Sequence, residues 1–175
     1  MNPIYKYLVL LVVSMAVIGV TVYYQLGGFK EVEVFELKGE QKVVVGRAYE
    51  GSGTHPGVRR YLIESQRLVL DSAINGTLAR IVHRTSDESN MVSYFIGILI
   101  DGEMAEVPQG YEVRTYQPQR RFAVFLAMNK WVRPSSRKID QMLNEQATAA
   151  GYDLPSTIAE LYYVDDSMSV EGWVE

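Results

Sequence analysis

The sequence predicts an α+β fold: duplicated ββαββ-like units that form one pseudo-twofold antiparallel sheet with two helices on one face, preceded by one transmembrane helix. Three features predict it. Residues 7–26 form an uncharged apolar run. After this run, two segments with helical spacing of apolar residues are each flanked by runs typical of strands, in the same order twice. With 47% hydrophobic and 22% charged residues, the chain has the composition of a protein that forms a core.

Residues 7–26 match the length of a membrane-spanning helix, because a bilayer core about 30 Å thick needs roughly 20 helical residues. Lys6 closes one end of the run, and tyrosines lie near both ends, where interfacial aromatic residues are common. A cleaved signal peptide has a shorter apolar region followed by small residues, whereas this run ends in Tyr23-Tyr24-Gln25. The sequence therefore predicts an uncleaved anchor over residues 1–27, with the lipid bilayer as a partner through residues 7–26.

The charges around the run predict the orientation of the chain. Lys6 and the N-terminal amine lie on one side, whereas Lys30 on the other side is followed by Glu31. Cytoplasmic flanks carry an excess of positive charge. The expectation is a single-pass membrane protein with its N-terminus in the cytoplasm and its domain, residues 28–175, outside. A linker of about four residues, 27–30, would keep the domain within about 15 Å of the bilayer.

The first half of the domain spans about residues 31–101. Strict alternation and β-branched side chains predict its strands, and Pro56 begins a helix with Thr54 as the expected cap. The apolar stripe of this helix runs to Ala73. The expected elements are strands at residues 31–37, 41–50, 78–83 and 92–100 and a helix that begins at Pro56 and ends at Asn75-Gly76.

The second half, about residues 111–175, repeats this order after a linker at residues 102–110. The expected elements are strands at residues 111–116, 121–128, 158–163 and 169–174 and a helix that begins at Pro134 and stops at Gly151. Each unit alone would bury one face of its sheet. Two units side by side would leave a groove between the halves, and such grooves are common ligand sites.

Composition excludes several classes of site. The chain has no cysteine, so neither a disulfide nor a thiolate site is expected. The net charge is −4 and paired arginines such as Arg120-Arg121 are isolated, so nucleic acid is not an expected partner. His55 and His83 lie far apart in the sequence, and neither a metal nor a cofactor is expected.

Three stretches carry a resemblance to a known family: Tyr49-Glu50-Gly51 before the first helix, residues 121–128 before the second, and residues 159–163 before the terminal strand. They look like the GyrI-like (effector-binding) domain, a small-molecule-binding domain with a duplicated ββαββ-like architecture, over about residues 31–175. The membrane-anchored branch of that family, to which a testis-expressed reticulophagy receptor belongs, is similar at residues 23–26, 125–134 and 159–165. The helix-turn-helix module of other members is not recognised here, which disfavours a transcription regulator.

Glu160 is the most prominent candidate for a ligand-binding residue. It lies in an expected strand among apolar and aromatic neighbours, where a desolvated carboxylate attracts cations. GyrI-like domains hold lipophilic cations with an acidic residue of a matching Glu-x-Tyr motif, so the resemblance assigns this role to Glu160 and Tyr162. The further candidates are aromatic residues that could line the groove: Tyr49, Tyr94, Phe125 and Trp131. The alternatives are a solvated Glu160 on an exposed face and aromatic side chains packed in the core.

These residues favour a membrane-anchored module that binds a small amphipathic or cationic molecule in the groove between its halves. No catalytic residue is expected in this interpretation. A second interpretation is a hydrolase of reactive, cyclopropane-containing compounds, which some GyrI-like relatives resemble, with Glu160 and Tyr162 as the active groups. A third is a protein-interaction domain whose groove holds no small ligand.

Overall fold

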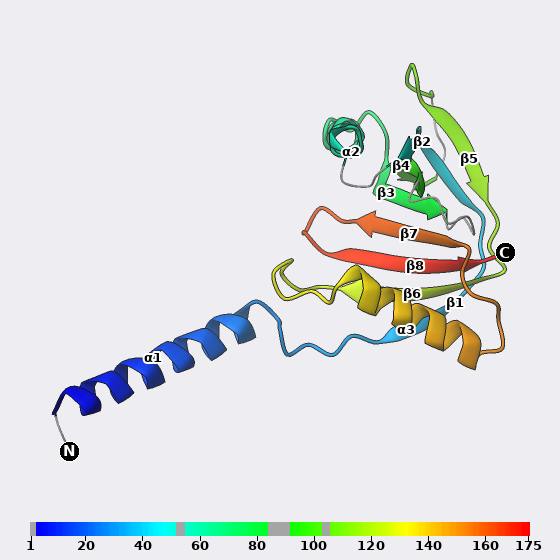
Figure 1. The fold of residues 1–175 in the computed structure, drawn as a ribbon. Coiled ribbons are helices and arrows are strands. Elements are labelled where there is room, and N and C mark those ends of the chain that lie inside the picture. The colour runs from blue at the N-terminus through cyan, green and yellow to red at the C-terminus, as the bar shows by residue number, and fades with distance from the viewer. Residues whose placement is uncertain (1–2, 52–54, 84–91, 103–105) are drawn as a thin grey trace.

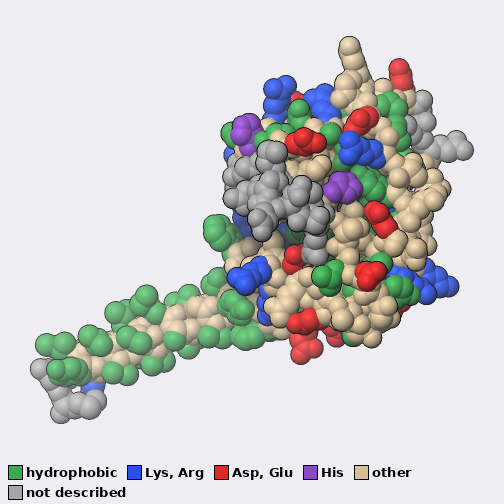
Figure 2. Space-filling view, turned by 45° about the vertical axis from the view of Figure 1, so that its right-hand side comes forward, with side chains coloured by type: hydrophobic (Ala, Val, Ile, Leu, Met, Phe, Trp, Pro, Cys, Tyr) green, Lys and Arg blue, Asp and Glu red, His purple; other side chains and the backbone are tan. Residues whose placement is uncertain are grey.

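The computed structural model describes residues 3–51, 55–83, 92–102 and 106–175. Helix α1 (Pro3–Gln25) extends away from a curled sheet that carries α2 (Pro56–Leu70) and α3 (Ser136–Ala149) (Figure 1). Among the described residues, Ile4–Gln25 is the one helix long and apolar enough to cross a membrane, and none of it is buried. Figure 2 shows this helix as a rod of hydrophobic side chains beside a domain with a mixed, charged surface.

Within its described residues, the domain contains one eight-stranded sheet in the order β1-β6-β8-β7-β3-β4-β2-β5, and all neighbouring strands are antiparallel. Its strands are β1 (Val34–Lys38), β2 (Lys42–Gly51), β3 (Gly76–His83), β4 (Val92–Ile100), β5 (Glu112–Tyr116), β6 (Arg120–Leu126), β7 (Thr157–Tyr162) and β8 (Met168–Val174). The predicted α+β fold with an antiparallel sheet and an apolar N-terminal helix is confirmed.

The pseudo-twofold arrangement has a feature that the sequence did not predict. Counted outward from the centre, one half of the sheet is β7-β8-β6-β1 and the other is β3-β4-β2-β5. The first strand of each unit therefore pairs with the second strand of the other unit, as β1 does with β6 and β5 with β2. This exchange interlocks the two halves, so neither half has a complete sheet without the other.

Short connections force the sheet to curl. Strands β1 and β2 are joined by residues 39–41, a stretch of chain that spans at most about 14 Å. In a flat sheet the six strand spacings between them would cover roughly 29 Å. The face without helices therefore becomes the inside of the curl, where Phe95 and Trp173 are fully buried. The sequence predicts that each unit alone would bury one sheet face, and in the assembled domain both faces of the sheet contain buried clusters.

Two glycines permit the tight coiling on that inner face. Gly46 and Gly97 lie directly opposite each other on β2 and β4. A Cβ atom on Gly97 would collide with the carbonyl oxygen of Val45 and with the Cα atom of Gly46. Glycine inside a strand commonly marks such a close approach of two backbones.

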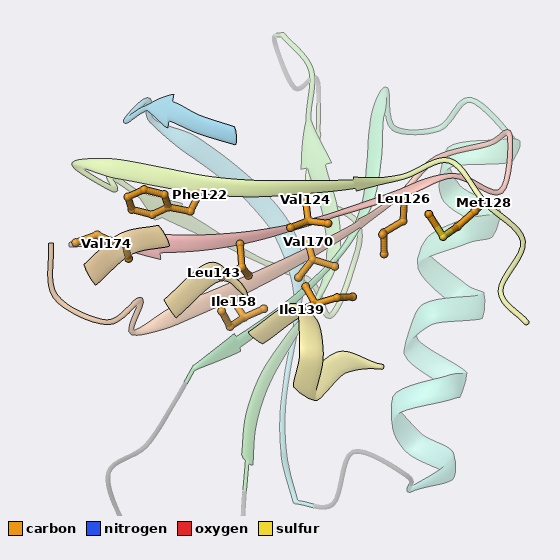
Figure 3. Packing of buried hydrophobic residues seen from close by; sticks show 10 residues of the cluster. Phe122, Val124, Leu126, Met128, Ile139, Leu143, Ile158, Val170 and Val174 are labelled. Atoms are coloured by element: carbon orange, nitrogen blue, oxygen red, sulfur yellow. The ribbon is translucent and has the colours of Figure 1, made fainter. Parts of the chain in front are cut away.

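The outer face carries both helices, as predicted. Helix α2 packs on β2, β3 and β4, and α3 packs on β1, β6 and β8. The α3 side is a cluster in which Ile139 and Leu143 contact the alternating residues of β6 and β8 (Figure 3). Its labelled strand residues are Phe122, Val124, Leu126, Ile158, Val170 and Val174. The positions of these residues identify the side chains of each strand that face the helices.

Helix α2 ends earlier than predicted. It stops at Leu70 rather than at Asn75-Gly76, because Ser72 adopts a left-handed conformation with φ of 55°. The amide of Ala73 then donates to the carbonyl of Leu68 at 3.0 Å, which satisfies an orphan carbonyl of the last turn. The N-cap is His55, whose Nδ1 accepts from Gly57 N at 3.1 Å, whereas the predicted cap Thr54 lies outside the described residues.

Candidate functional site

A row of polar and aromatic side chains crosses the helix-bearing face of the sheet between α2 and α3. The two central strands place Arg80 opposite Glu160 and Leu78 opposite Tyr162. Alternate residues of a strand share a face, and Ile158 of β7 packs against α3. Glu160 and Tyr162 therefore lie on that same face, in the space between the helices.

Glu160 forms the centre of this row and is only 9% exposed. Its carboxylate accepts two hydrogen bonds from Arg80, from Nε at 2.8 Å and from Nη2 at 2.6 Å. The Tyr162 hydroxyl donates a third hydrogen bond to Oε2. The lone, cation-attracting carboxylate that the sequence indicated is thus already neutralised by an arginine of the neighbouring strand. Bidentate pairs of this kind are among the stronger hydrogen-bonded contacts in proteins.

The surroundings of Tyr162 and Arg80 favour a neutral phenol and a charged guanidinium. Burial raises the pKa of the Tyr162 phenol, and the nearby Glu160 carboxylate raises it further. Burial opposes the charge of Arg80, but the hydrogen bonds and charge of Glu160 outweigh it and raise the pKa of Arg80. The charges of Arg80 and Glu160 therefore balance within the row, and the Tyr162 hydroxyl donates a hydrogen bond to the Glu160 carboxylate.

Two of the predicted aromatic residues join this row on the α2 side. The guanidinium of Arg80 lies 5.9 Å from the ring centroid of Tyr94. The ring of Tyr94 lies 6.3 Å from that of Tyr49, which in turn contacts Tyr61 of α2 at 6.4 Å. Tyr49, Tyr94, Glu160 and Tyr162 are thus brought to one face of the sheet.

Phe125 and Trp131 lie outside this row. Phe125 alternates with Val124 and Leu126, which face α3, so its own ring points to the opposite face and contacts Phe35 at 6.0 Å. Trp131 lies in the segment between β6 and α3, with 78% of its surface exposed. The expectation that these two rings line the groove beside Glu160 is not met in the structure.

Arg80 and Tyr61 belong to the row but were not predicted. Arg80 is a single charged residue in the strand Leu78-Ala79-Arg80-Ile81-Val82, the same pattern that drew attention to Glu160. A single charge in an apolar strand marks Arg80 and Glu160 each as a candidate for a buried ion pair, but the pairing of β3 with β7 is needed to match the two.

A cavity of about 1090 Å³ opens at the Tyr162 end of the row. Leu78 and Tyr162 contribute its floor, and Leu62 of α2 contributes one wall. Its remaining walls come from residues 24–27, 29–30, 127–130, 133, 163 and 165–167, together with Gln66. The cavity therefore lies between the two halves and also reaches the end of α1.

The junction that follows α1 is bound to the domain. The amide of Asn129 donates to the Leu26 carbonyl at 3.0 Å, and Lys30 Nζ donates to the Ala127 carbonyl at 2.8 Å. Arg133 Nε supports the same segment by donating to Met128 O at 3.0 Å. The predicted short linker, residues 27–30, is thus hydrogen-bonded to the domain and forms one wall of the cavity.

A second buried charged cluster occupies the inner face of the sheet. Arg121 Nη1 lies 3.0 Å from Glu171 Oε2, which also accepts from Trp173 Nε1 at 2.9 Å. Arg121 Nη2 reaches Glu40 at 2.8 Å. Arg121, Glu171 and Trp173 satisfy one another inside the core, and the exposed Glu40 pairs with Arg121 at its edge. Among the described residues, no three His, Cys, Asp or Glu side chains gather in a way that could hold a metal ion.

Comparison with known proteins identifies the fold. No protein-family model matches the chain, and no curated protein matches it. The solved EcmrR C-terminal domain is similar over 84% of this chain and 98% of that chain, with 12% identity and a TM-score of 0.54. The domain has the GyrI-like fold. EcmrR in a complex with DNA is similar over 98% of this chain and 68% of that chain, with 14% identity and a TM-score of 0.50.

A third solved structure, SAV2435 bound to tetraphenylphosphonium, covers 83% of this chain and 94% of that chain at 13% identity, with a TM-score of 0.46. The likeness to the two EcmrR structures, at 12% and 14% identity, establishes the fold alone, and the DNA and the phosphonium belong to the proteins in which they are found. The absence of a nucleic-acid partner and the membrane-anchored branch of the family both stay predictions.

Proposed function

We propose that the protein is a membrane-anchored domain that binds a small amphipathic molecule in the groove between its two halves. The observation that carries this proposal is the cavity of about 1090 Å³ at the end of the Arg80–Glu160–Tyr162 row. Ligand pockets in proteins commonly measure roughly 300–1000 Å³, so the cavity has room for a whole small molecule.

The lining of the cavity favours a molecule with one apolar and one polar part. Leu62, Leu78 and Met128 supply apolar surface, and the cavity also has aromatic walls at Phe29 and Tyr162. Its charged lining residues are of both signs: Lys30, Lys130, Arg133, Asp165 and Asp166. A pocket with apolar surface and charges of both signs suits an amphipathic ligand better than a ligand that is recognised by its charge alone.

The ion pair between Glu160 and Arg80 opposes the alternative in which a cationic ligand binds to Glu160. A cationic ligand would have to displace Arg80 from both carboxylate oxygens or bind to the tyrosine faces instead. The same pairing gives no support to hydrolysis, because both carboxylate oxygens of Glu160 already accept hydrogen bonds from Arg80 or Tyr162. Binding of an amphipathic molecule requires no such displacement.

The anchor is the second part of the proposal. Helix α1 has no charged residue after Lys6 and no buried face, which suits a helix surrounded by lipid. The positive charge of Lys6 favours an orientation with the N-terminus in the cytoplasm and the domain outside, and this orientation is part of the proposal. We expect the chain to resist alkaline extraction from membranes. We also expect external protease to digest the domain in intact vesicles whose lumen corresponds to the cytoplasm.

Ligand binding can be tested on the full chain in nanodiscs by equilibrium dialysis. The probes are a lysophosphatidylcholine with a twelve-carbon chain and tetraphenylphosphonium, each compared with empty nanodiscs. We expect saturable binding of the lysolipid, weaker binding after Leu62→Trp narrows the cavity, and unchanged binding after Phe125→Leu outside the row. Binding equal to that of empty nanodiscs would refute the proposal, and saturable binding of the phosphonium alone would favour the cationic alternative.

A further inference from the structure

The end of the domain next to α1 carries an unusual concentration of exposed apolar side chains. Val164 is 86% exposed, Trp131 is 78% exposed and Phe29 is 62% exposed, and no large apolar side chain elsewhere in the described part of the domain exceeds 62%. Single exposed apolar residues are ordinary on a soluble surface, but a cluster marks a site of contact.

These residues belong to three segments that meet around the mouth of the cavity. Phe29, Lys130 and Tyr163 line the cavity directly, and Trp131 and Val164 adjoin the last two in the chain. Figure 1 shows the β6–α3 segment (yellow) and the β7–β8 turn (orange) at the end of the domain from which α1 extends. The cluster therefore faces the direction in which α1 leaves the domain.

The composition of this surface is typical of a membrane–water interface. Tryptophan, tyrosine and lysine combine an apolar body with a polar tip and favour the headgroup region of a bilayer. The last turn of α1 continues the surface, because the ring of Tyr23 contacts Phe29 at 5.0 Å and that of Tyr24 contacts it at 6.4 Å.

The fixed junction sets the height of this surface above the membrane core. The carbonyl of Leu26, at the end of the apolar helix, accepts directly from the amide of Asn129. Trp131 follows two residues later, so its Cα atom lies within about 7 Å of that of Asn129. The headgroup layer on each side of the hydrocarbon core is roughly 5–8 Å thick. Trp131 therefore lies within reach of the headgroups whenever α1 spans the bilayer.

We propose that the junction surface, formed by Tyr24, Phe29, Lys130, Trp131 and Val164, inserts into the headgroup layer of the bilayer that α1 spans. The cavity then opens into this layer, and an amphipathic ligand enters it from the membrane rather than from water. This inference rests on the anchor in the proposed function. The lining of the cavity carries charges of both signs, such as Asp165 and Lys130, so zwitterionic phosphatidylcholine is the lipid used in the test.

Fluorescence of the full chain in phosphatidylcholine vesicles tests the inference. Trp173 is buried in the core and gives a constant background, so the difference between the wild type and Trp131→Phe isolates the emission of Trp131. Spin-labelled phosphatidylcholine is added with the nitroxide near the headgroup or near the bilayer centre. The control combines Trp131→Phe with Leu154→Trp, which moves the reporter to a 58% exposed position before β7.

We expect the shallow nitroxide to quench Trp131 at least twice as strongly as the deep nitroxide and to leave the Leu154→Trp reporter unchanged. An unquenched Trp131 in a chain that resists alkaline extraction would overturn the inference and leave the anchor standing. A chain that alkaline buffer removes from the vesicles would overturn both. Equal quenching of the two reporters would also refute the inference, because the domain would then lie on the bilayer in another orientation.

Discussion

Replacement of Glu160 by glutamine is expected to destabilise the domain by leaving the Arg80 guanidinium without a counter-charge. Removal of one partner from a buried ion pair costs about 3–5 kcal/mol. Arg80 keeps 24% side-chain exposure, and glutamine retains one oxygen acceptor, so the expected loss is smaller, about 2–3 kcal/mol. A loss of this size corresponds to a fall in Tm of about 4–12 °C for a chain of this length.

The matched double variant Arg80→Met with Glu160→Gln should recover most of the lost stability, because it also removes the unpaired charge. The assay is urea unfolding of the full chain in nanodiscs, followed by the fluorescence of buried Trp173. Glu112→Gln, which breaks the exposed pair with Arg114, serves as the control and should change stability by less than about 0.5 kcal/mol. A Glu160→Gln loss no larger than that of the control would refute the description of the row as desolvated.

Three further predictions concern the inner face. Glu171→Gln should cost about 2–3 kcal/mol in the same urea assay, because Arg121 then keeps only the exposed Glu40 as a counter-charge; a loss below about 1 kcal/mol would contradict this. Gly97→Ala should abolish the cooperative transition, because its Cβ would collide with the Val45 carbonyl, and a normal transition would count against the tight coiling. Burial, followed by the charge of Arg114, lowers the pKa of His83, so the contribution of neutral His83 is complete above pH 6.5 and is lost as the pH falls through its folded pKa. His83→Asn should flatten this dependence of the unfolding midpoint on pH, and an unchanged slope would exclude His83 as its origin.

Local patterns were sufficient to predict the elements. The strand at Val92–Ile100 has the bounds expected from its apolar run, and α3 ends where Gly151 adopts a φ of 80°. Pairing between distant segments was not predictable in the same way. Strands β1 and β5 are only five residues long each, and nothing in their sequences distinguishes pairing within a unit from exchange between units. The curl follows from that exchange together with the short connections.

The candidate site was predictable only in part. The spacing of two residues within one strand places Glu160 and Tyr162 on the same face. Arg80 escaped attention because it lies 80 residues before Glu160, and only the pairing of β3 with β7 brings the two together. The aromatic character of Phe125 is compatible with a groove, but the alternation of β6 directs Val124 and Leu126 toward α3 and therefore turns Phe125 to the opposite face.

The junction could not be predicted from the sequence for a related reason. Its hydrogen bonds join residues nearly a hundred positions apart, such as Lys30 and Ala127. A short glycine-containing segment after an apolar helix is compatible with a free linker or with a fixed one, and only the tertiary fold distinguishes them. The consequence for function is large, because the fixed junction places the cavity beside the end of α1.

The central claim is that the cavity between the halves holds an amphipathic molecule. Photo-crosslinking of the full chain in nanodiscs with a diazirine-bearing lysophosphatidylcholine, followed by peptide mass spectrometry, tests it most directly. The account predicts adducts on the cavity-lining residues Leu62, Met128 and Tyr162, with their yield reduced by excess unlabelled lysolipid and by Leu62→Trp. Adducts confined to α1, or spread over the surface without competition, would contradict it.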